Sequence, residues 1–370
     1  MAQTYAAGAA GTLRTGLTPQ IWDDTFFRDY VRASRFKRYM GTDEASIIQL
    51  KEDLTKKRGD SVVYALVNEL TGAGVTGNST LKGNEERLGN RSHAIRVNAL
   101  RHAVAVDDWD MQQSVIDLRD AARVQLREWS MKTLRNNITS ALGMIDGTNF
   151  LTASATQLNT WTTNNQDRIL FGLTTSNYTA VFNTAIQSLS AGEQLTPLAL
   201  SLMKRMAQSA MPKIKPVYVK EMDQEWYVAF IGPKAWRDLT EDNPTTNVLT
   251  LANRDARIRG EDNPLFTGDS LVWDGMILRE IPEIRSLVGY SGSAGAAIEP
   301  VYLCGAQAIG LAWAQRTKTT TDTDDYEFLH GVGVQEIRGI EKLRFGTAAT
   351  DTTTPKDHGI VTGFFAAASD

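Results

Sequence analysis

The residues of this chain that could carry chemistry are few, and the clearest of them form a glycine-rich stretch. Gly72-Ala73-Gly74-Val75-Thr76-Gly77 has the spacing of a dinucleotide-binding loop, and it follows a predicted strand. In such a site the third glycine opens a helix whose N-terminus binds the pyrophosphate. Residues 78–84 are instead Asn, Ser, Thr, Leu, Lys, Gly and Asn, which favour a loop. The pattern therefore indicates a flexible loop tip rather than a nucleotide site.

The remaining candidates for chemistry are an acidic cluster, separate histidines and one serine. The acidic cluster resembles a calcium loop but lacks its central glycine and its final glutamate; it comprises Asp322, Asp324, Asp325 and Glu327. The histidines have no spacing typical of a zinc site; they are His93, His102, His330 and His358. Ser291 lies in a sequence that lacks the last glycine of a hydrolase nucleophile elbow. The sequence therefore predicts that the chain is not an enzyme and uses no cofactor and no metal.

Charge and cysteine content exclude further classes of protein. The chain has 370 residues and a formal net charge of −4, whereas a protein that holds nucleic acid by its phosphates needs a basic surface. The single cysteine, Cys304, excludes an internal disulfide framework and fits a reducing compartment. Residues 1–19 lack the apolar core of a signal peptide, and no apolar run approaches the ~20 residues of a membrane span. We therefore expect a soluble protein made in a cytoplasm.

The elements that would position functional residues begin with a long hairpin over residues 58–106. Its arms, residues 58–70 and 91–106, show strand-like composition or alternation, and its tip, residues 71–90, holds five glycines. A two-stranded ribbon is at best marginally stable alone, and this one has too few large apolar residues for a core of its own. We therefore expect it to lie on another surface, as the arms of subunits in repeating assemblies do.

A long helix is predicted directly after the hairpin, from Asp107 to Leu142. Acidic residues at its start suit the positive end of the helix dipole, and no Gly or Pro interrupts it. Such a helix would be roughly 50 Å long. Its apolar stripe places Trp129 against a sheet and leaves Lys132 off the packed face.

The rest of the chain mixes helices and strands, so the predicted fold class is α+β. Thr196-Pro197 has the pattern of an N-cap and a first-turn proline for a helix over residues 198–210. Another helix is expected over residues 178–189. From residue 215 the pattern favours strands and ends in a closing strand pair over residues 330–345, after which residues 346–359 are expected to be loose.

The order of these elements resembles the Hong Kong 97-like fold of tailed-phage major capsid proteins. More specifically, the chain looks like the major capsid family typified by the N-four-type phages. The motifs that carry the resemblance occur in a specific order from about residue 20 to 345; they are Phe26-Phe27-Arg28-Asp29-Tyr30, Arg168-Ile169-Leu170-Phe171-Gly172, Phe230-Ile231-Gly232-Pro233-Lys234-Ala235-Trp236-Arg237-Asp238-Leu239, Asn263-Pro264-Leu265-Phe266, Leu303-Cys304-Gly305-Ala306-Gln307-Ala308, and Asp325-Tyr326 with His330-Gly331-Val332-Gly333-Val334 through Lys342 to Phe345.

The resemblance implies a division of the chain into five regions. They are an N-terminal arm and helix (1–57), an extended loop (58–108), a peripheral domain (109–212 with 317–345, including the spine helix 109–142), an axial domain (213–316) and a C-terminal tail (346–370). The extended loop is expected to contact neighbouring subunits; the residues expected there are Arg58, Glu69, Lys82, Glu85, Arg87 and Arg91. Shells of this fold can crosslink a lysine to an asparagine, but nothing in the sequence identifies a partner for Lys82.

The resemblance also implies the function: a major capsid protein that assembles with itself into hexamers and pentamers of an icosahedral shell around packaged phage DNA. Its further partners would be a separate scaffolding protein and a portal; a decoration protein is left open. Double-stranded DNA would lie near it only non-specifically, and no membrane is involved. The protein would be assembled in the host bacterial cytoplasm and located in the virion. The alternatives are an encapsulin-like shell of a cellular nanocompartment and, more remotely, a nucleotide-binding enzyme.

Overall fold

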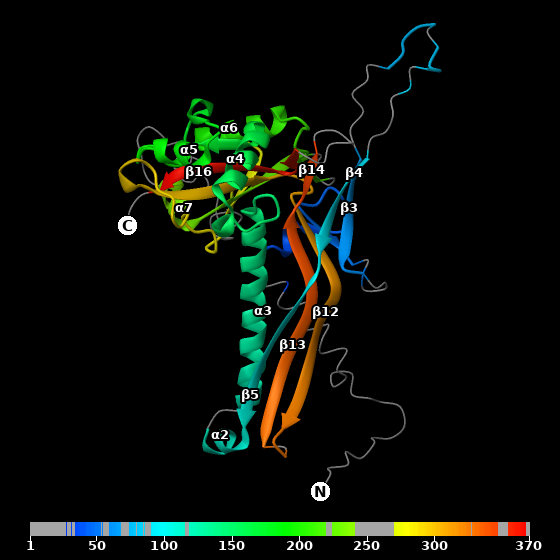
Figure 1. Ribbon diagram of the computed structural model, residues 1–370, viewed down its shortest axis with the longest axis vertical. Helices are drawn as coiled ribbons and strands as arrows, with labels where there is room; N and C mark the ends of the chain where they lie inside the picture. Colours follow the sequence, from blue (N-terminus) through cyan, green and yellow to red (C-terminus); the bar gives the residue numbers. More distant parts are fainter. Residues whose placement is uncertain are drawn as a thin grey trace, which may run out of the picture.

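The molecule is elongated, with a lobe at one end and a ribbon of long strands beside helix α3 (Leu118–Leu142) at the other (Figure 1). A computed structural model describes residues 27, 31, 34–52, 54, 59–67, 74–78, 80–83, 85, 90–114, 118–219, 224–240, 270–326, 328–346 and 354–367. Among the described helices, none is long and apolar enough to cross a membrane.

The lobe is built on a seven-stranded sheet. Its strands follow the order β6-β16-β11-β8-β10-β9, and β7 pairs with the start of β8. Their bounds are β6 Ile169–Phe171, β7 Val217–Val219, β8 Gln224–Ile231, β9 Ser270–Trp273, β10 Met276–Glu280, β11 Ala297–Cys304 and β16 Ile360–Ala367. Strands β8, β11 and β16 are mostly buried, in keeping with their continuous apolar runs.

Helices cover both faces of the lobe sheet. They are α4 Ala155–Asn164, α5 Phe182–Ser188, α6 Pro197–Ser209 and α7 Pro233–Thr240. One face of the sheet packs against α6 and α7, and the other against α4, α5 and the end of α3. Short 3-10 turns occur at Lys37–Tyr39, Phe150–Thr152, Gln166–Arg168, Thr175–Asn177 and Ser293–Gly295.

Two of these helices show how local signals begin a helix. Helix α6 begins as predicted, because the Thr196 hydroxyl accepts the N–H of Ala199 at 3.2 Å and Pro197 occupies the first turn. Helix α4 is not among the helices predicted from the sequence. Its start is nevertheless encoded, since Ser154 and Gln157 form a capping box.

The ribbon is a second, five-stranded sheet in the order β1-β2-β12-β13-β5. The bounds are β1 Met40–Gly41, β2 Ile48–Lys51, β5 Asn98–Asp107, β12 Ile309–Asp324 and β13 Leu329–Lys342. Strands β12 and β13 form a long antiparallel pair, and β5 pairs with the other edge of β13. The prediction of a closing strand pair over residues 330–345 is therefore wrong, because β13 is one continuous strand. It is followed by β14 (Arg344–Gly346), which pairs with β15 (Pro355–Asp357).

The predicted hairpin is confirmed at its base and is shorter than expected. Strand β3 (Ser61–Val67) pairs with β4 (Asn90–Arg96) in antiparallel register. After Val97 the chain pairs with β13 instead, so residues 98–106 belong to the ribbon. The described residues of the tip, 74–78, 80–83 and 85, lie away from the rest of the molecule (Figure 1).

The base of the hairpin has no core of its own and packs on the ribbon, as the sequence predicts. Tyr64 and Ile95 are fully buried in one cluster with Leu343 of the segment after β13. Gly339 of β13 allows the hairpin to lie this close to the ribbon, because a side chain at this position would overlap the backbone of Arg96.

The prediction of one continuous helix from Asp107 to Leu142 is wrong, because the structure has two helices there. The start is confirmed, because the Asp107 side chain accepts the N–H of Asp110 at 2.9 Å and begins α2 (Asp108–Gln113). Ser114 is extended and ends α2. Helix α3 then has 25 residues and is about 37 Å long. The segment after Ser114 contains Val and Ile, whose β-branched side chains favour a helix less than Leu or Ala do.

The predicted packed face of α3 is confirmed. Leu126, Leu134 and Ile138 are buried against the ribbon and the lobe, whereas Lys132 is exposed. Trp129 faces the ribbon at the margin of this stripe, with its ring 4.6 Å from that of His102 on β5. It is half-buried rather than buried.

Replacing Trp129 with alanine is therefore expected to destabilise the chain by about 1–3 kcal/mol, less than the ~3–5 kcal/mol of a fully buried tryptophan. The loss comes from the ring contact that α3 makes with β5. Urea unfolding of the isolated chain measures it. Lys132→Ala is the matched control and should stay within about 0.5 kcal/mol. The reverse ranking would show that α3 presents a different face to the ribbon.

The structure also departs from the predicted division into regions. Residues 145–212, predicted to be peripheral, contribute α4, α5, α6 and β6 to the lobe. The prediction of a C-terminal tail over residues 346–370 is wrong for its described part, because β16 lies between β6 and β11 inside the lobe sheet. The apolar run at residues 360–367 must be buried, and a central strand achieves this.

Candidate assembly surfaces and a buried polar junction

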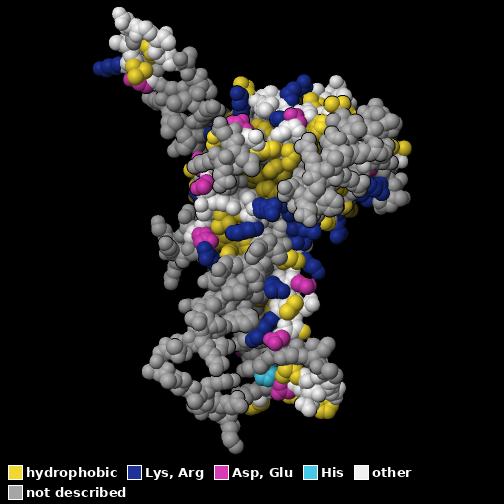
Figure 2. Space-filling view, turned by 180° about the vertical axis from the view of Figure 1, so that it is seen from behind, with side chains coloured by type: hydrophobic (Ala, Val, Ile, Leu, Met, Phe, Trp, Pro, Cys, Tyr) yellow, Lys and Arg dark blue, Asp and Glu magenta, His cyan; other side chains and the backbone are white. Residues whose placement is uncertain are grey.

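The hairpin tip is the surface on which the sequence places contacts with neighbouring subunits. Lys82 and Glu85 are both exposed there, and Glu85 accepts the N–H of Gly83 at 2.7 Å. Leu81 beside them is 63% exposed. Figure 2 shows basic, acidic and hydrophobic side chains together at this projecting end. Three other residues of the extended loop that are expected to contact a neighbour lie outside the described residues; they are Arg58 and Glu69 of the first arm and Arg87 of the tip.

Arg91, the remaining predicted contact residue, lies at the base of the hairpin and not at its tip. It is half-buried on β4. Burial and, to a smaller extent, the nearby cations, among them Arg168 and Arg91, together lower the pKa of His358 to about 3. Arg91 therefore also interacts with its own chain, and its contact with a neighbouring subunit stays a prediction.

The base of the hairpin is fixed to the ribbon by polar contacts as well as by its apolar cluster. His93 Nε2 lies 3.3 Å from Glu341 Oε2 of β13. The Lys51 ammonium group donates to the carbonyl of Val63 at 2.9 Å and lies 5.0 Å from the ring centre of Tyr64. A fixed base with a projecting tip is an arrangement suited to reaching an adjacent molecule.

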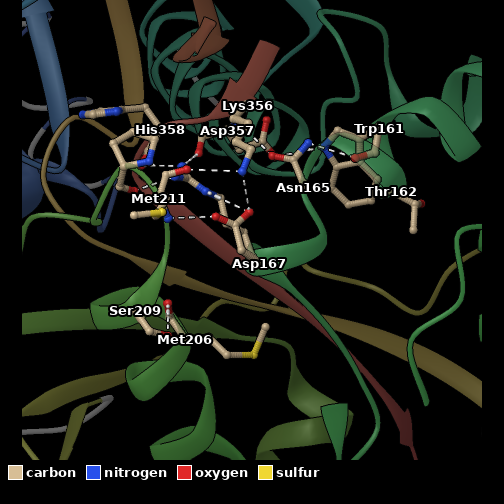
Figure 3. A network of polar contacts seen from close by, with 12 residues as sticks. Trp161, Thr162, Asn165, Asp167, Met206, Ser209, Met211, Lys356, Asp357 and His358 are labelled. Carbon is tan, nitrogen blue, oxygen red and sulfur yellow. Dashed lines mark hydrogen bonds and ion pairs between the residues drawn. The ribbon is translucent and has the colours of Figure 1, made fainter. Parts of the chain in front are cut away.

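A buried polar junction lies where the ribbon meets the lobe, centred on Asp357 of β15 (Figure 3). The Asp357 carboxylate accepts from the ammonium group of Lys342 at 2.9 Å and from the indole N–H of Trp161 at 3.0 Å. Its backbone N–H donates to Asn165 Oδ1 at 2.8 Å. Lys342 and Asp357 are almost fully buried, so their charges are compensated mainly by each other.

Arg168 extends this junction to the segment that follows α6. Its guanidinium group donates to the carbonyls of Asp357, of His358 at 3.1 Å and of Pro212 at 2.6 Å. Burial lowers the pKa of Arg168. At the outer side, Lys356 Nζ lies 3.1 Å from Asp167 Oδ1. The junction thus ties β15 to α4, to the end of α6 and to β13.

This junction acts as a structural joint and was not among the residues singled out from the sequence. Its members come from four separate stretches of the chain, so no local spacing predicts them.

The glycine-rich stretch forms no helix over its described residues, since Gly77 and Asn78 form a turn and residues 80–83 are turn or irregular. Within the described part of the chain, no group of three or more His, Cys, Asp or Glu side chains could hold a metal ion.

A projecting hairpin, a helix-backed ribbon and a mixed lobe are what the resemblance to phage capsids leads one to expect. The model of a family described as phage capsid protein matches residues 14–368. The chain belongs to this phage capsid protein family. The major capsid protein of Pseudomonas phage KPP25 is 26% identical to it over 371 residues, which cover 94% of each chain.

Solved structures of capsid proteins resemble the chain along most of its length. The capsid of cyanophage Pam1 is 35% identical, with a TM-score of 0.79 over 92% of this chain and 94% of that one. The capsid of Ralstonia phage GP4, 21% identical, has the same fold, with a TM-score of 0.72 over 90% and 91% of the two chains. The prediction of a phage major capsid protein with an α+β, Hong Kong 97-like fold is confirmed. The matches give no support to the nanocompartment alternative, and the family is one of structural proteins.

Proposed function

We propose that this chain is the major capsid protein of a tailed phage, whose copies assemble as hexamers and pentamers into an icosahedral shell around packaged double-stranded DNA. The observation that carries the proposal is the capsid family match over residues 14–368. The hairpin supports it, because its base is fixed to the ribbon and its tip offers exposed side chains to a neighbour.

The regions of the chain take the following roles in this proposal. The lobe is the axial domain, the ribbon with α3 is the core of the peripheral domain, residues 58–97 are the extended loop and residues 1–57 include the N-terminal arm. The residues of the extended loop that would contact a neighbouring subunit are Lys82, Glu85 and Arg87 at the tip and Arg58, Glu69 and Arg91 on the arms. A closed shell repeats such heterologous contacts by symmetry.

Further partners follow from the same proposal. A shell of this kind would be built on a separate scaffolding protein and around a portal, in the host cytoplasm, and would end as part of the virion. With a formal net charge of −4, the chain would lie near the packaged DNA without binding it tightly.

Deleting residues 72–89, the hairpin tip, is expected to abolish shells while leaving the subunit folded. The tip contributes no member to the described apolar clusters, so the lobe and the ribbon should keep their structure. Circular dichroism measures the helicity, and electron microscopy of the purified product counts the particles. Lost helicity would place the tip in the subunit core, and undiminished particle yield would contradict a role in assembly.

A matched pair of exposed leucines gives a finer control for this experiment. Leu81 at the tip is 63% exposed and Leu198 on α6 is 76% exposed. Leu81→Ser should reduce the particle yield, whereas Leu198→Ser should leave it within about twofold of the parent, as is usual for a surface substitution.

A further inference from the structure

A cavity of about 360 Å³ lies between the lobe sheet and the segment that leads from the turn Lys37–Tyr39 into β2. One of its walls is formed by strands β7–β10, and the other by residues 38–40 and 46–47. We call it the arginine cavity, after Arg38 and Arg279, which lie on opposite walls. Its volume falls within the ~300–1,000 Å³ that is typical of small-molecule sites.

The sheet wall of the arginine cavity is apolar and continues to the edge of the lobe sheet. Val228 of β8, Ile277 of β10 and Val272 of β9 lie side by side, in register across three strands. Trp226, two residues before Val228 on the same face of β8, is half-buried. Val272 is 54% exposed, so this apolar row is uncovered at its outer end. A surface of this kind favours a ligand with an apolar body.

The two guanidinium groups make the cavity positively charged. The one side-chain hydrogen bond described for Arg279 goes to the hydroxyl of Tyr39, at 3.5 Å, and Arg279 Nε is buried without a partner. Across the described residues, neither Arg38 nor Arg279 forms an ion pair, and no acidic side chain lines the cavity. Cations that are partly removed from water are stabilised by an anion beside them. The ligand group that the cavity favours is therefore an anion.

The backbone around the cavity favours a small ligand over a peptide. Strands β8 and β10 are paired on both edges where they line the wall, so their N–H and C=O groups are used within the sheet. A peptide brings polar backbone groups of its own, which cost free energy when they are buried without partners. Besides the indole of Trp226, the polar side chains described in the lining are Arg38, Tyr39, Ser46 and Arg279. This set suits one anionic group.

We propose that the arginine cavity binds a small amphipathic carboxylate, that is, an apolar chain that ends in one carboxylate group. The chain lies along the row of Val228, Ile277 and Val272, and the carboxylate accepts hydrogen bonds from Arg38 and Arg279. A guanidinium group can donate two parallel hydrogen bonds to one carboxylate. The ligand joins the segment before β2 to the lobe sheet, and it stabilises the folded chain because the unfolded chain has no such site.

Decanoate is the probe for this site, and the unassembled chain is the sample. Titration calorimetry should show saturable binding, and thermal unfolding should move to higher temperature as decanoate is added. Decanol has the same apolar chain without the carboxylate and should bind at least about tenfold more weakly. Absence of saturable decanoate binding, or equal binding of decanol, overturns the inference. Either result leaves the proposed function intact, because the site needs only one copy of the chain.

Two pairs of variants test the residues of the site. Arg279→Gln should lower the affinity for decanoate about tenfold or more, whereas Arg205→Gln, at an exposed position of α6 on the other face of the sheet, should leave it within about twofold. Val272→Asp places a carboxylate at the open end of the apolar row and should also weaken binding. Its control is Val288→Asp, since Val288 is 73% exposed outside the described lining. Parent-like affinity in Arg279→Gln or Val272→Asp would place decanoate elsewhere and overturn the inference.

A peptide probe distinguishes a small molecule from a segment of another protein. Acetyl-leucyl-leucine carries apolar side chains and one carboxylate on a peptide backbone. It should bind more weakly than decanoate, because its amide groups would lack partners against the paired strands β8 and β10. Tighter binding of the peptide than of decanoate would identify a protein segment as the occupant of the cavity, and it would overturn the inference of a small-molecule site.

Discussion

Replacing Lys342 with methionine is expected to destabilise the isolated chain by about 3–5 kcal/mol. The Lys342 ammonium group lies 2.9 Å from the Asp357 carboxylate, with side-chain exposures of 1% and 3%. Methionine keeps most of the volume of the lysine side chain but removes its charge. Asp357 would then be a buried carboxylate whose remaining side-chain donor is the indole N–H of Trp161. Urea unfolding of the unassembled chain measures the loss.

Two further variants separate lost charge pairing from lost packing. In the double variant Lys342→Met, Asp357→Asn neither charge remains, so most of the lost stability should return. Lys356→Met removes the outer pair with Asp167, where both side chains are partly exposed, and should cost at most about 1 kcal/mol. If Lys356→Met proves far more damaging than Lys342→Met, the centre of the junction is not at Asp357.

Features set by neighbouring residues could be predicted from the sequence. Thr196 and Pro197 begin α6 because a capping side chain and a fixed φ act within one turn. The pairing of β3 with β4 follows from strand-forming arms around a glycine-rich tip. The buried stripe of α3 follows from apolar residues at helical spacing. In each case the decisive interactions join residues close together in the chain.

Features set by distant residues were mispredicted. Strand β5 pairs with β13 and not with the other arm of the hairpin, and the sequence of residues 98–107 does not indicate which strand its partner is. Strand β16 falls within the predicted C-terminal tail. Its apolar run is typical of a buried strand, but the sheet that it completes begins nearly two hundred residues earlier, at β6. The break between α2 and α3 at Ser114 has no glycine or proline to announce it.

The residues of the candidate surfaces also differ in whether nearby or distant parts of the chain determine their surroundings. Lys82 and Glu85 could be placed on an exposed tip because a glycine-rich polar loop has few ways to be buried. The surroundings of Arg91 within its own chain could not be predicted, because they include His358 from the other end of the chain. The junction around Asp357 has no sequence signal, since Trp161, Lys342 and Asp357 become neighbours only after both sheets have formed.

A second large effect is expected from Glu299→Gln, and it should depend on pH. Glu299 of β11 is 1% exposed, and its carboxylate accepts the N–H of Ala235 at the start of α7 at 2.5 Å. Its pKa is raised from 4.5 to about 7, mainly by burial and also by the charge of Asp238, and the hydrogen bond from Ala235 limits the rise. Between these two pKa values the folded chain binds more protons than the unfolded chain. Its stability is therefore greatest below the unfolded pKa and falls as the pH rises toward 7.

A pKa shift of this size corresponds to about 3 kcal/mol of folding stability that the parent loses above neutral pH. Glutamine carries no charge and its side-chain oxygen can still accept from Ala235, so Glu299→Gln should lack this loss. Thermal unfolding should show the variant close to the parent near about pH 5 and more stable than the parent near about pH 8. Glu225→Gln on the exposed start of β8 is the control and should follow the parent at both values. If Glu299→Gln is instead less stable than the parent at the higher pH, then the ionised carboxylate gains more from the N-terminus of α7 than burial takes away, and Glu299 is a charged helix cap.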